Sequence, residues 1–154
     1  FNTQNTNITK KDEELAPELF HVAREKGTEI PYTGKYVETK EKGTYMCAIC
    51  GTALFSSDTK FDSGTGWPSF TEPANRGHIA LAEDTGNGSK RTEVLCKTCG
   101  AHLGHVFDDG PETRGGKRYC VNSCAMRFIP RDQMEAEGYG AYVHLIDNPP
   151  PPAS

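Results

Sequence analysis

The sequence lacks a long hydrophobic run: no stretch approaches the roughly 18 apolar residues that define a membrane-spanning helix. It also lacks the charged-then-apolar opening of a secretion signal. Basic residues are not in excess, because 17 Lys and Arg are set against 21 Asp and Glu, which gives a formal charge of −4. We therefore expect neither a nucleic-acid partner nor a membrane partner. The sequence predicts a cytoplasmic monomer, although a chain that begins at Phe1 rather than Met is also compatible with a removed leader.

No internal repeat divides the chain, and its 154 residues suit one domain. A domain of this size buries about 68–70% of the surface that its unfolded chain exposes, which is enough for one core. We therefore predict a single domain over residues 1–154. Residues 1–11 are polar and residues 148–154 contain four consecutive prolines, so both ends are predicted to be flexible tails.

Helix signals are confined to the N-terminal part of the chain. Pro17 can begin a short helix and Gly27 can end it. Later segments are short, rich in β-branched or aromatic residues and bounded by Gly, Pro, Asp or Asn. They are Tyr36–Glu38, Thr44–Met46, His78–Ala82, Thr92–Leu95, Lys117–Asn122 and Tyr142–Ile146. The sequence predicts a mainly β, mainly antiparallel domain with a short N-terminal helical appendage.

The six cysteines fall into two kinds, and four of them form two identical Cys-x-x-Cys-Gly motifs. Cys47 pairs with Cys50 in the first motif, and Cys96 pairs with Cys99 in the second. This spacing lets two thiolates bind one tetrahedral zinc ion. Four thiolates leave no open coordination position, so the sequence predicts a structural zinc site. The alternative, four cysteines packed in an apolar core, does not explain two identical motifs.

Cys120 and Cys124 lie outside these motifs, and Cys120 is the candidate nucleophile. Residues alternate in direction along a strand, so Arg118, Cys120 and Asn122 are predicted to share one face. Arg118 would favour the Cys120 thiolate, and Asn122 could hydrogen-bond a neutral polar ligand. In the alternative interpretation Cys120 is a buried core residue and Arg118 points to solvent.

A pair of histidines, His102 and His105, follows the second cysteine motif directly. Residues three apart lie on opposite faces of a regular strand, but Gly104 would allow a bulge that brings both imidazoles together. Either histidine could act as an acid near neutral pH, with Asp109 as an orienting partner or an acid. The alternatives are two further zinc ligands or two surface histidines without function.

The single tryptophan, Trp67, stands between Gly64-Thr65-Gly66 and Pro68. A loop of this composition could present the indole as a flat wall to a methyl or thioether group. The alternative is a tryptophan of the core.

Five motifs occur in one order along the chain, namely Cys47–Gly51, Asp62–Phe70, Cys96–Gly100, Gly100–Gly110 and Arg118–Ser123. Together they resemble methionine-R-sulfoxide reductase of the B type, over about residues 17–130. The resemblance implies a zinc-stabilised domain of two antiparallel sheets. It implies that Cys120 is the catalytic nucleophile, and that the active site also contains Trp67, His102, His105, Asp109, Arg118 and Asn122. Phe128 is a further candidate for the substrate pocket.

In the implied mechanism, the Cys120 thiolate attacks the sulfoxide sulfur. His105, with His102 or a bound water, protonates the departing oxygen, and methionine and a Cys120 sulfenic acid result. Trp67 would hold the ε-methyl group. Selection of the R epimer, in a peptide or as the free amino acid, is implied by the family.

The chain departs from the family pattern at Thr65, where many members carry a cysteine that resolves the sulfenic acid. Cys124 is then the remaining intramolecular candidate, with thioredoxin or another thiol reductant completing the cycle. In an extended chain the Cα atoms of residues 120 and 124 would be about 13 Å apart, beyond the roughly 4.4–6.8 Å of a disulfide. We therefore predict a bend after Asn122.

Two other classes of protein are compatible with parts of this pattern. A zinc-stabilised module that binds peptides would keep its affinity in Cys120→Ser, whereas a reductase would lose its chemistry. A peroxide-sensing thiol protein would oxidise with peroxide and show no preference between sulfoxide epimers. The tryptophan loop and the histidine pair fit these classes less well.

Overall fold

The structure, a computed structural model, describes residues 12–25, 27–85, 90–112, 115–143 and 146. The predicted tails at 1–11 and 148–154 lie outside these residues. In the part described there is one longer helix, α2 (Pro17–Glu25), together with short 3-10 helices. The 3-10 helices are η1 (Asp12–Glu14), η2 (Ser57–Thr59), η3 (Arg76–His78), η5 (Ser123–Ala125), η6 (Arg131–Gln133) and η7 (Gly140–Tyr142). None of these helices has the length and apolar character needed to cross a bilayer.

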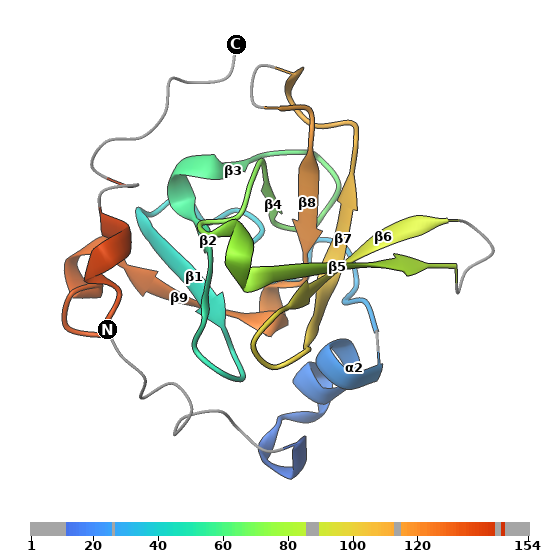
Figure 1. Ribbon diagram of the computed structural model, residues 1–154, viewed down its shortest axis with the longest axis horizontal. Coiled ribbons are helices and arrows are strands. Elements are labelled where there is room, and N and C mark those ends of the chain that lie inside the picture. Colours follow the sequence, from blue (N-terminus) through green and yellow to red (C-terminus); the bar gives the residue numbers. More distant parts are fainter. Residues whose placement is uncertain (1–11, 26, 86–89, 113–114, 144–145, 147–154) are drawn as a thin grey trace.

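The strands form two antiparallel sheets, as the resemblance to the reductase family implies. The smaller sheet has the order β2-β1-β9, with β1 at Gly43–Cys47, β2 at Ala53–Ser56 and β9 at Met126–Pro130. The larger sheet has the order β3-β4-β8-β7-β6-β5. Its strands are β3 (Lys60–Phe61), β4 (Ser69–Phe70), β5 (Ile79–Asp84), β6 (Arg91–Cys96), β7 (His102–Phe107) and β8 (Arg118–Val121). Figure 1 shows the two sheets and the long β5–β6 hairpin extending from the larger one.

The main core is built from side chains of both sheets and of α2. Tyr45 and Phe55 from the smaller sheet pack with Phe70 from the larger sheet, and Phe55 and Phe70 stack with ring centroids 4.5 Å apart. All five residues of β1 are buried, because a second apolar cluster covers the other face of the smaller sheet. That cluster joins Met46 and Ile129 to the C-terminal turns. Two covered faces explain why β1 does not alternate between apolar and polar residues.

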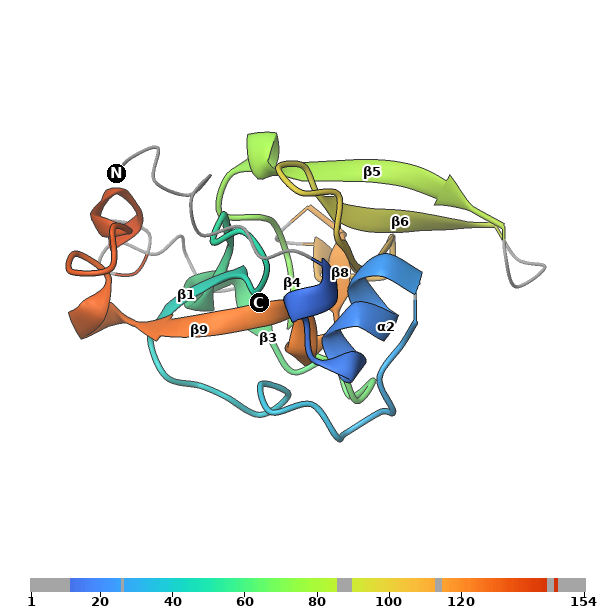
Figure 2. The ribbon, with the colours of Figure 1, turned by 90° about the horizontal axis from the view of Figure 1, so that it is seen from below.

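Helix α2 begins at Pro17 and is closed by Gly27, as predicted. The Gly27 N–H donates to the carbonyl oxygen of His21, 2.8 Å away, which is a bond typical of a helix C-terminus. Leu19 and Val22 are buried on the face that meets the core. Figure 2 shows the irregular chain after α2 running along the lower side of the molecule to β1, and this segment passes beside the site described below.

Two predicted strands are wrong. Tyr36–Glu38 forms a turn, in which the Tyr36 ring packs edge-on against Tyr45 with centroids 5.4 Å apart. Tyr142–Ile146 contains the end of η7, and residues 144 and 145 lie outside the described ones. In both segments the aromatic residues reflect side-chain packing rather than strand pairing. The other four predicted strands overlap β1, β5, β6 and β8.

Candidate active site

Cys120 lies in β8, near the middle of the larger sheet. Its register partners are Ser69 on β4 and His105 on β7. Residues directly opposite each other in an antiparallel pair have Cβ atoms about 4.5–5.5 Å apart, so the Cys120 thiol and the His105 imidazole are neighbours. The backbones meet so closely here that a Cβ on Gly104 would overlap the carbonyl oxygen of Cys120. Glycine at position 104 is therefore a packing requirement of the site.

Cys120 opens into a cavity of about 160 Å³. Ligand pockets commonly measure about 300–1,000 Å³, so this volume suits a single side chain rather than a larger molecule. The cavity is lined by Thr28, Thr65, Trp67, Arg91, Gly104, His105, Phe107, Arg118, Cys120, Val121 and Asn122. Of the eight residues predicted for the catalytic and substrate sites besides Cys120, four line the cavity, namely Trp67, His105, Arg118 and Asn122. The other four, His102, Asp109, Cys124 and Phe128, do not.

The two histidines converge, as the sequence suggests. The β6–β7 register shifts between Val94 and Leu95, which leaves Leu103 as an extra residue in β7. This bulge brings the imidazoles of His102 and His105 to a centroid distance of 5.3 Å in an edge-on arrangement. His105 faces the cavity, and His102 lies behind it with 2% of its surface exposed.

Each histidine has a carboxylate partner that the sequence interpretation missed. His105 Nε2 lies 2.8 Å from Asp84 Oδ2, and His102 Nδ1 lies 2.7 Å from Glu93 Oε2. Burial lowers the pKa of His102, an effect that the Glu93 carboxylate partly opposes. His102 is therefore expected to stay neutral and to donate its Nδ1 proton to Glu93. Both acids lie on the β5–β6 hairpin, Asp84 on β5 and Glu93 on β6. The only sequence signal for them is that each is an acidic residue within or next to a predicted strand.

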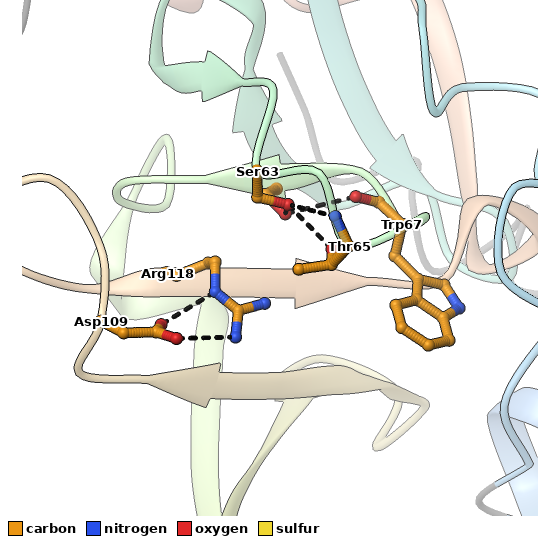
Figure 3. Close-up of polar contacts among 6 residues, drawn as sticks. Ser63, Thr65, Trp67, Asp109 and Arg118 are labelled. Carbon is orange, nitrogen blue, oxygen red and sulfur yellow. Dashed lines mark hydrogen bonds and ion pairs between the residues drawn. The ribbon is translucent and has the colours of Figure 1, made fainter.

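Arg118 reaches the cavity from β8 and is held there by Asp109. Its Nε donates to Asp109 Oδ1 at 2.9 Å and its second nitrogen donates to Oδ2 at 3.2 Å, as Figure 3 shows. The guanidinium also lies over the Phe107 ring, 4.5 Å from its centroid. Hydrogen bonding from Arg118 lowers the pKa of the exposed Asp109 carboxyl. Asp109 therefore orients Arg118 and does not itself face the cavity.

The Trp67 loop is held by a short chain of hydroxyl groups. Ser63 Oγ lies 2.8 Å from Thr65 Oγ1 and 2.7 Å from Ser69 Oγ, and Ser69 Oγ donates to the carbonyl oxygen of Trp67. Figure 3 shows Thr65 between Arg118 and Trp67. The loop thus places the indole and the Thr65 hydroxyl at the cavity. In the sequence, Thr65 was notable only because many family members have a cysteine at this position. In the structure, Thr65 lines the cavity.

The ionisation of Cys120 reflects opposing effects. Burial raises the pKa of this thiol above its ordinary value. The positive charge of Arg118 and a hydrogen bond from the Thr65 hydroxyl act in the opposite direction, and Asp109 adds a smaller increase. The predicted influence of Arg118 has the right sign, but burial is the largest effect and the pKa is raised overall.

Asn122 and Glu29 connect the end of β8 to the segment after α2. Asn122 Oδ1 accepts a hydrogen bond from the Glu29 N–H at 3.0 Å, and Asn122 Nδ2 donates to the carbonyl oxygen of Leu103. The Glu29 carboxylate accepts from the backbone N–H groups of Ser123 at 2.6 Å and Cys124 at 3.3 Å. Glu29 is 7% exposed and was missed from the sequence, where it is one acidic residue among 21 Asp and Glu.

The chain bends after Asn122, as predicted, because η5 begins at Ser123. Cys124 consequently does not line the cavity. Its sulfur lies within 4.8 Å of carboxylate oxygens of Glu18 and Glu29. Burial, and next the charge of Glu29, raise the pKa of Cys124 to about 12.

Phe128 also lies outside the cavity. It belongs to β9, where its ring packs against Tyr45 at 4.8 Å and Tyr36 at 6.3 Å between centroids. The structure therefore places Phe128 against the aromatic core rather than in the cavity lining.

The four remaining cysteines form one cluster that joins the two sheets. All four sulfur atoms lie within 4.8 Å of one another, with Cys47 and Cys99 sulfurs 3.6 Å apart and Cys50 and Cys96 sulfurs 3.5 Å apart. A tetrahedron of sulfurs about 2.3 Å from a central zinc has edges of about 3.8 Å, so this donor set fits a metal ion. The two histidines are not part of the cluster.

The comparisons with known proteins agree with this arrangement. The SelR domain model matches residues 15–130. The chain is 50% identical over 128 residues to the peptide methionine sulfoxide reductase MsrB of Leptospira interrogans, with 80% of this chain and 97% of that protein covered. It is 54% identical over 130 residues to the MsrB of Methanosarcina barkeri, covering 82% and 91%. It is 51% identical over 126 residues to the mitochondrial methionine-R-sulfoxide reductase B3 of Mus musculus, covering 82% of this chain and 49% of that one. The chain belongs to the methionine-R-sulfoxide reductase B family.

Proposed function

We propose that this chain, a thiol-dependent peptide-methionine (R)-S-oxide reductase, performs the reduction at Cys120. The observation that carries this proposal is the position of Cys120. Of the six cysteines, all of which the structure describes, Cys120 is the one that lines the cavity, opposite His105 and beside Trp67. Four of the others form the metal-type cluster, and Cys124 faces Glu29.

The first step transfers oxygen from one sulfur to another. The Cys120 sulfur bonds to the sulfoxide sulfur while the oxygen is protonated, and the sulfur–oxygen bond breaks with release of hydroxide. Hydroxide then attacks the Cys120 sulfur, the new sulfur–sulfur bond breaks, and the products are methionine and a sulfenic acid on Cys120. The proton released by the thiol and the proton delivered to oxygen balance. His105 is the group placed to move them, because it faces the cavity and Asp84 holds its other nitrogen. His102 supports the ring of His105 from behind.

Burial of Cys120 suits a nucleophile that is activated only when substrate is present. Its raised pKa keeps the thiol protonated in the absence of substrate, which slows its oxidation by other oxidants. A bound sulfoxide adds a basic oxygen beside His105, and Arg118 and Thr65 favour the thiolate as it forms. Trp67 provides the wall for the methyl group, and a fixed wall, acid and nucleophile together distinguish the two sulfur epimers.

The sulfenic acid is next converted to a Cys120–Cys124 disulfide with release of water, and thioredoxin or another thiol reductant returns both thiols. At a pKa of about 12, only about one Cys124 thiol in 10⁵ is ionised at pH 7. The step therefore requires η5 to open, so that Cys124 leaves Glu29 and approaches Cys120. Residues 123–125 form a single 3-10 turn, which is a small element to rearrange.

Zinc held by Cys47, Cys50, Cys96 and Cys99 completes the proposed enzyme. It supplies folding free energy by tying the end of β1 to the end of β6, and the reaction does not pass through it. The chain acts as a single reductase domain and as a monomer in the cytoplasm.

The experiment that tests the function is anaerobic incubation of the reduced protein with separated R and S epimers of N-acetyl-methionine sulfoxide amide. We expect one equivalent of N-acetyl-methionine amide from the R epimer and none from the S epimer. Cys120→Ser should form none while keeping its metal and its fold. Consumption of neither epimer by the wild-type protein, or undiminished turnover by Cys120→Ser, would contradict the proposal.

A further inference from the structure

Two apolar side chains stand exposed beside the active site. Ile30 is 71% exposed and Tyr32 is 64% exposed, and in the part of the chain that the structure describes the remaining large exposed hydrophobic residue is Leu81. Ile30 and Tyr32 flank Pro31 in the segment after α2, next to Glu29. These two residues lie within three positions of each other, in the segment whose Thr28 lines the Cys120 cavity. This arrangement indicates a contact surface rather than scattered exposure.

This surface is held rigidly against the tryptophan loop. The Tyr32 N–H donates to the carbonyl oxygen of Gly66 at 2.7 Å, and the Tyr32 hydroxyl donates to that of Gly64 at 2.8 Å. Gly66 is packed so tightly under the segment that a Cβ there would lie 2.7 Å from Pro31 and 3.0 Å from the Tyr32 ring. The exposed ring is therefore fixed in position before any ligand arrives.

The backbone of Tyr32 is strained. Its φ of 67° is the one positive φ of a residue other than glycine among those described. A bulky residue in this region costs about 1–3 kcal/mol and persists only where its surroundings impose it. Glycine or asparagine would adopt this positive φ at a lower free-energy cost. The backbone strain is therefore the cost of having an aromatic ring at position 32.

A second cavity continues the active site on this side. It measures about 500 Å³ and is lined by Tyr32 and Trp67 together with charged residues of both signs, among them Glu38, Lys40 and Lys60. Trp67 lines both cavities, so the two cavities are adjacent at this residue. The smaller cavity accommodates the reacting side chain, and the larger one is then placed to receive the chain on which that side chain is carried.

We propose that Ile30, Tyr32 and the 500 Å³ cavity form a docking surface for the peptide residues that flank the methionine sulfoxide on one side. An apolar residue next to the sulfoxide contacts Ile30 and the Tyr32 ring, so the surface selects among peptides by the residue that flanks the sulfoxide. Charged groups of both signs along the cavity suit the N–H and C=O groups of a peptide backbone rather than a ligand of one charge. This inference rests on the proposed function, since the peptide is the substrate of the Cys120 reaction.

The test measures kcat/KM with dithiothreitol as reductant, so that no protein reductant takes part. The substrates are the R epimer of N-acetyl-methionine sulfoxide amide, a pentapeptide in which Leu flanks the sulfoxide, and the same peptide with Gly in place of Leu. We expect the wild-type protein to prefer the Leu peptide. Tyr32→Gly removes the ring and keeps the positive φ, and Ile30→Ser removes the second apolar contact. Each should reduce the ratio of kcat/KM for the Leu peptide to that for the amide by about tenfold, mainly through KM.

Leu81→Ser is the matched control, because it removes an exposed hydrophobic residue of β5 that lines neither cavity and should leave the ratio unchanged. Equal losses on all substrates, or an unchanged ratio in both variants, would overturn the docking surface. A loss seen only when thioredoxin replaces dithiothreitol would assign the surface to the reductant and would also overturn it. Failure of the wild-type protein to reduce even the amide would instead refute the proposed function.

Discussion

The indole Nε1 of Trp67 donates a hydrogen bond to the backbone oxygen of Glu29, 2.9 Å away. The same glutamate binds Asn122 through its N–H and the backbone of η5 through its carboxylate. One buried residue therefore sets the position of the tryptophan wall relative to the end of the nucleophile strand. None of these contacts brings Glu29 into the cavity, so Glu29 acts by positioning other groups.

Glu29→Gln should weaken this link and destabilise the protein by about 1–3 kcal/mol. The amide replaces one acceptor oxygen with a donor, which leaves a buried N–H of Ser123 or Cys124 without a partner. Loss of the charge should also lower the pKa of Cys124, since Glu29 raises it. Chemical denaturation and the rate of Cys124 alkylation at pH 9 measure the two effects. Unchanged stability together with unchanged alkylation would contradict the positioning role.

His105→Asn should reduce kcat/KM by about 10²–10⁴-fold, the usual contribution of a general acid. Asp84→Asn should cause a smaller loss, because the imidazole remains but loses the carboxylate that orients it. His21→Gln is the control, since His21 is exposed on α2 and does not line the cavity. Steady-state kinetics with the R epimer measure all three. Near wild-type activity in His105→Asn would exclude His105 as the acid.

Much of this site could be predicted from local sequence. The cysteine motifs, the alternation that brings Cys120 beside Arg118 and the glycine that permits a bulge at the histidine pair all depend on neighbouring residues. Asp84 and Glu93 could not be predicted in the same way, because their partners are 21 and 9 residues distant and the hairpin register decides the contact. Glu29 lies 93 residues from Asn122, its partner in the fold.

The errors in the fold have the same origin. The aromatic side chain of Tyr36 suggested a strand. Its ring instead packs against Tyr45 and Phe128, while its backbone forms a turn. Short strands such as β3 and β4 contain two residues each and were missed, since two residues carry no detectable period. Local sequence patterns thus predicted the residues that line the cavity more completely than the distant residues that orient them.

Alkylation of Cys120 by iodoacetamide should increase with pH and reach half its maximal rate above the ordinary thiol value of about 8.5. Burial raises the pKa, so the reactive thiolate is populated only at higher pH. Arg118→Gln should move the midpoint higher still, because the positive charge that favours the thiolate is removed. Lys117→Gln is the matched control, since Lys117 pairs with Asp108. A midpoint below 8 in the wild-type protein, or one that Arg118→Gln lowers, would contradict this account.

Cys96→Ser should lose the metal and lower Tm by more than about 10 °C, because a structural zinc site contributes several kcal/mol to folding. Cys120→Ser should retain one metal ion per chain and unfold near the wild-type temperature, since Cys120 is not in the cluster. Elemental analysis and calorimetry compare the two variants. Equal metal content in both would contradict a site formed by the four clustered cysteines.

Mass spectrometry after one turnover without reductant should detect a Cys120–Cys124 disulfide. Cys124→Ser should release methionine in that turnover at the wild-type rate, because Cys124 does not line the cavity. It should then accumulate sulfenic acid and lose most of its thioredoxin-dependent recycling. The Cys124 thiolate is the attacking form, and burial and the charge of Glu29 raise the pKa of this thiol in the resting structure, so the rate of disulfide formation should increase as the pH is raised above neutrality.

Glu29→Gln provides an independent control of this resolving step. Because its removal of negative charge favours the Cys124 thiolate, disulfide formation should be faster in this variant even where methionine release is slower. The two rates can be separated in a single-turnover experiment that is quenched at intervals with a sulfenic-acid probe. A sulfenic acid that persists in the wild-type protein, or recycling that is undiminished in Cys124→Ser, would assign resolution to direct attack by an external thiol.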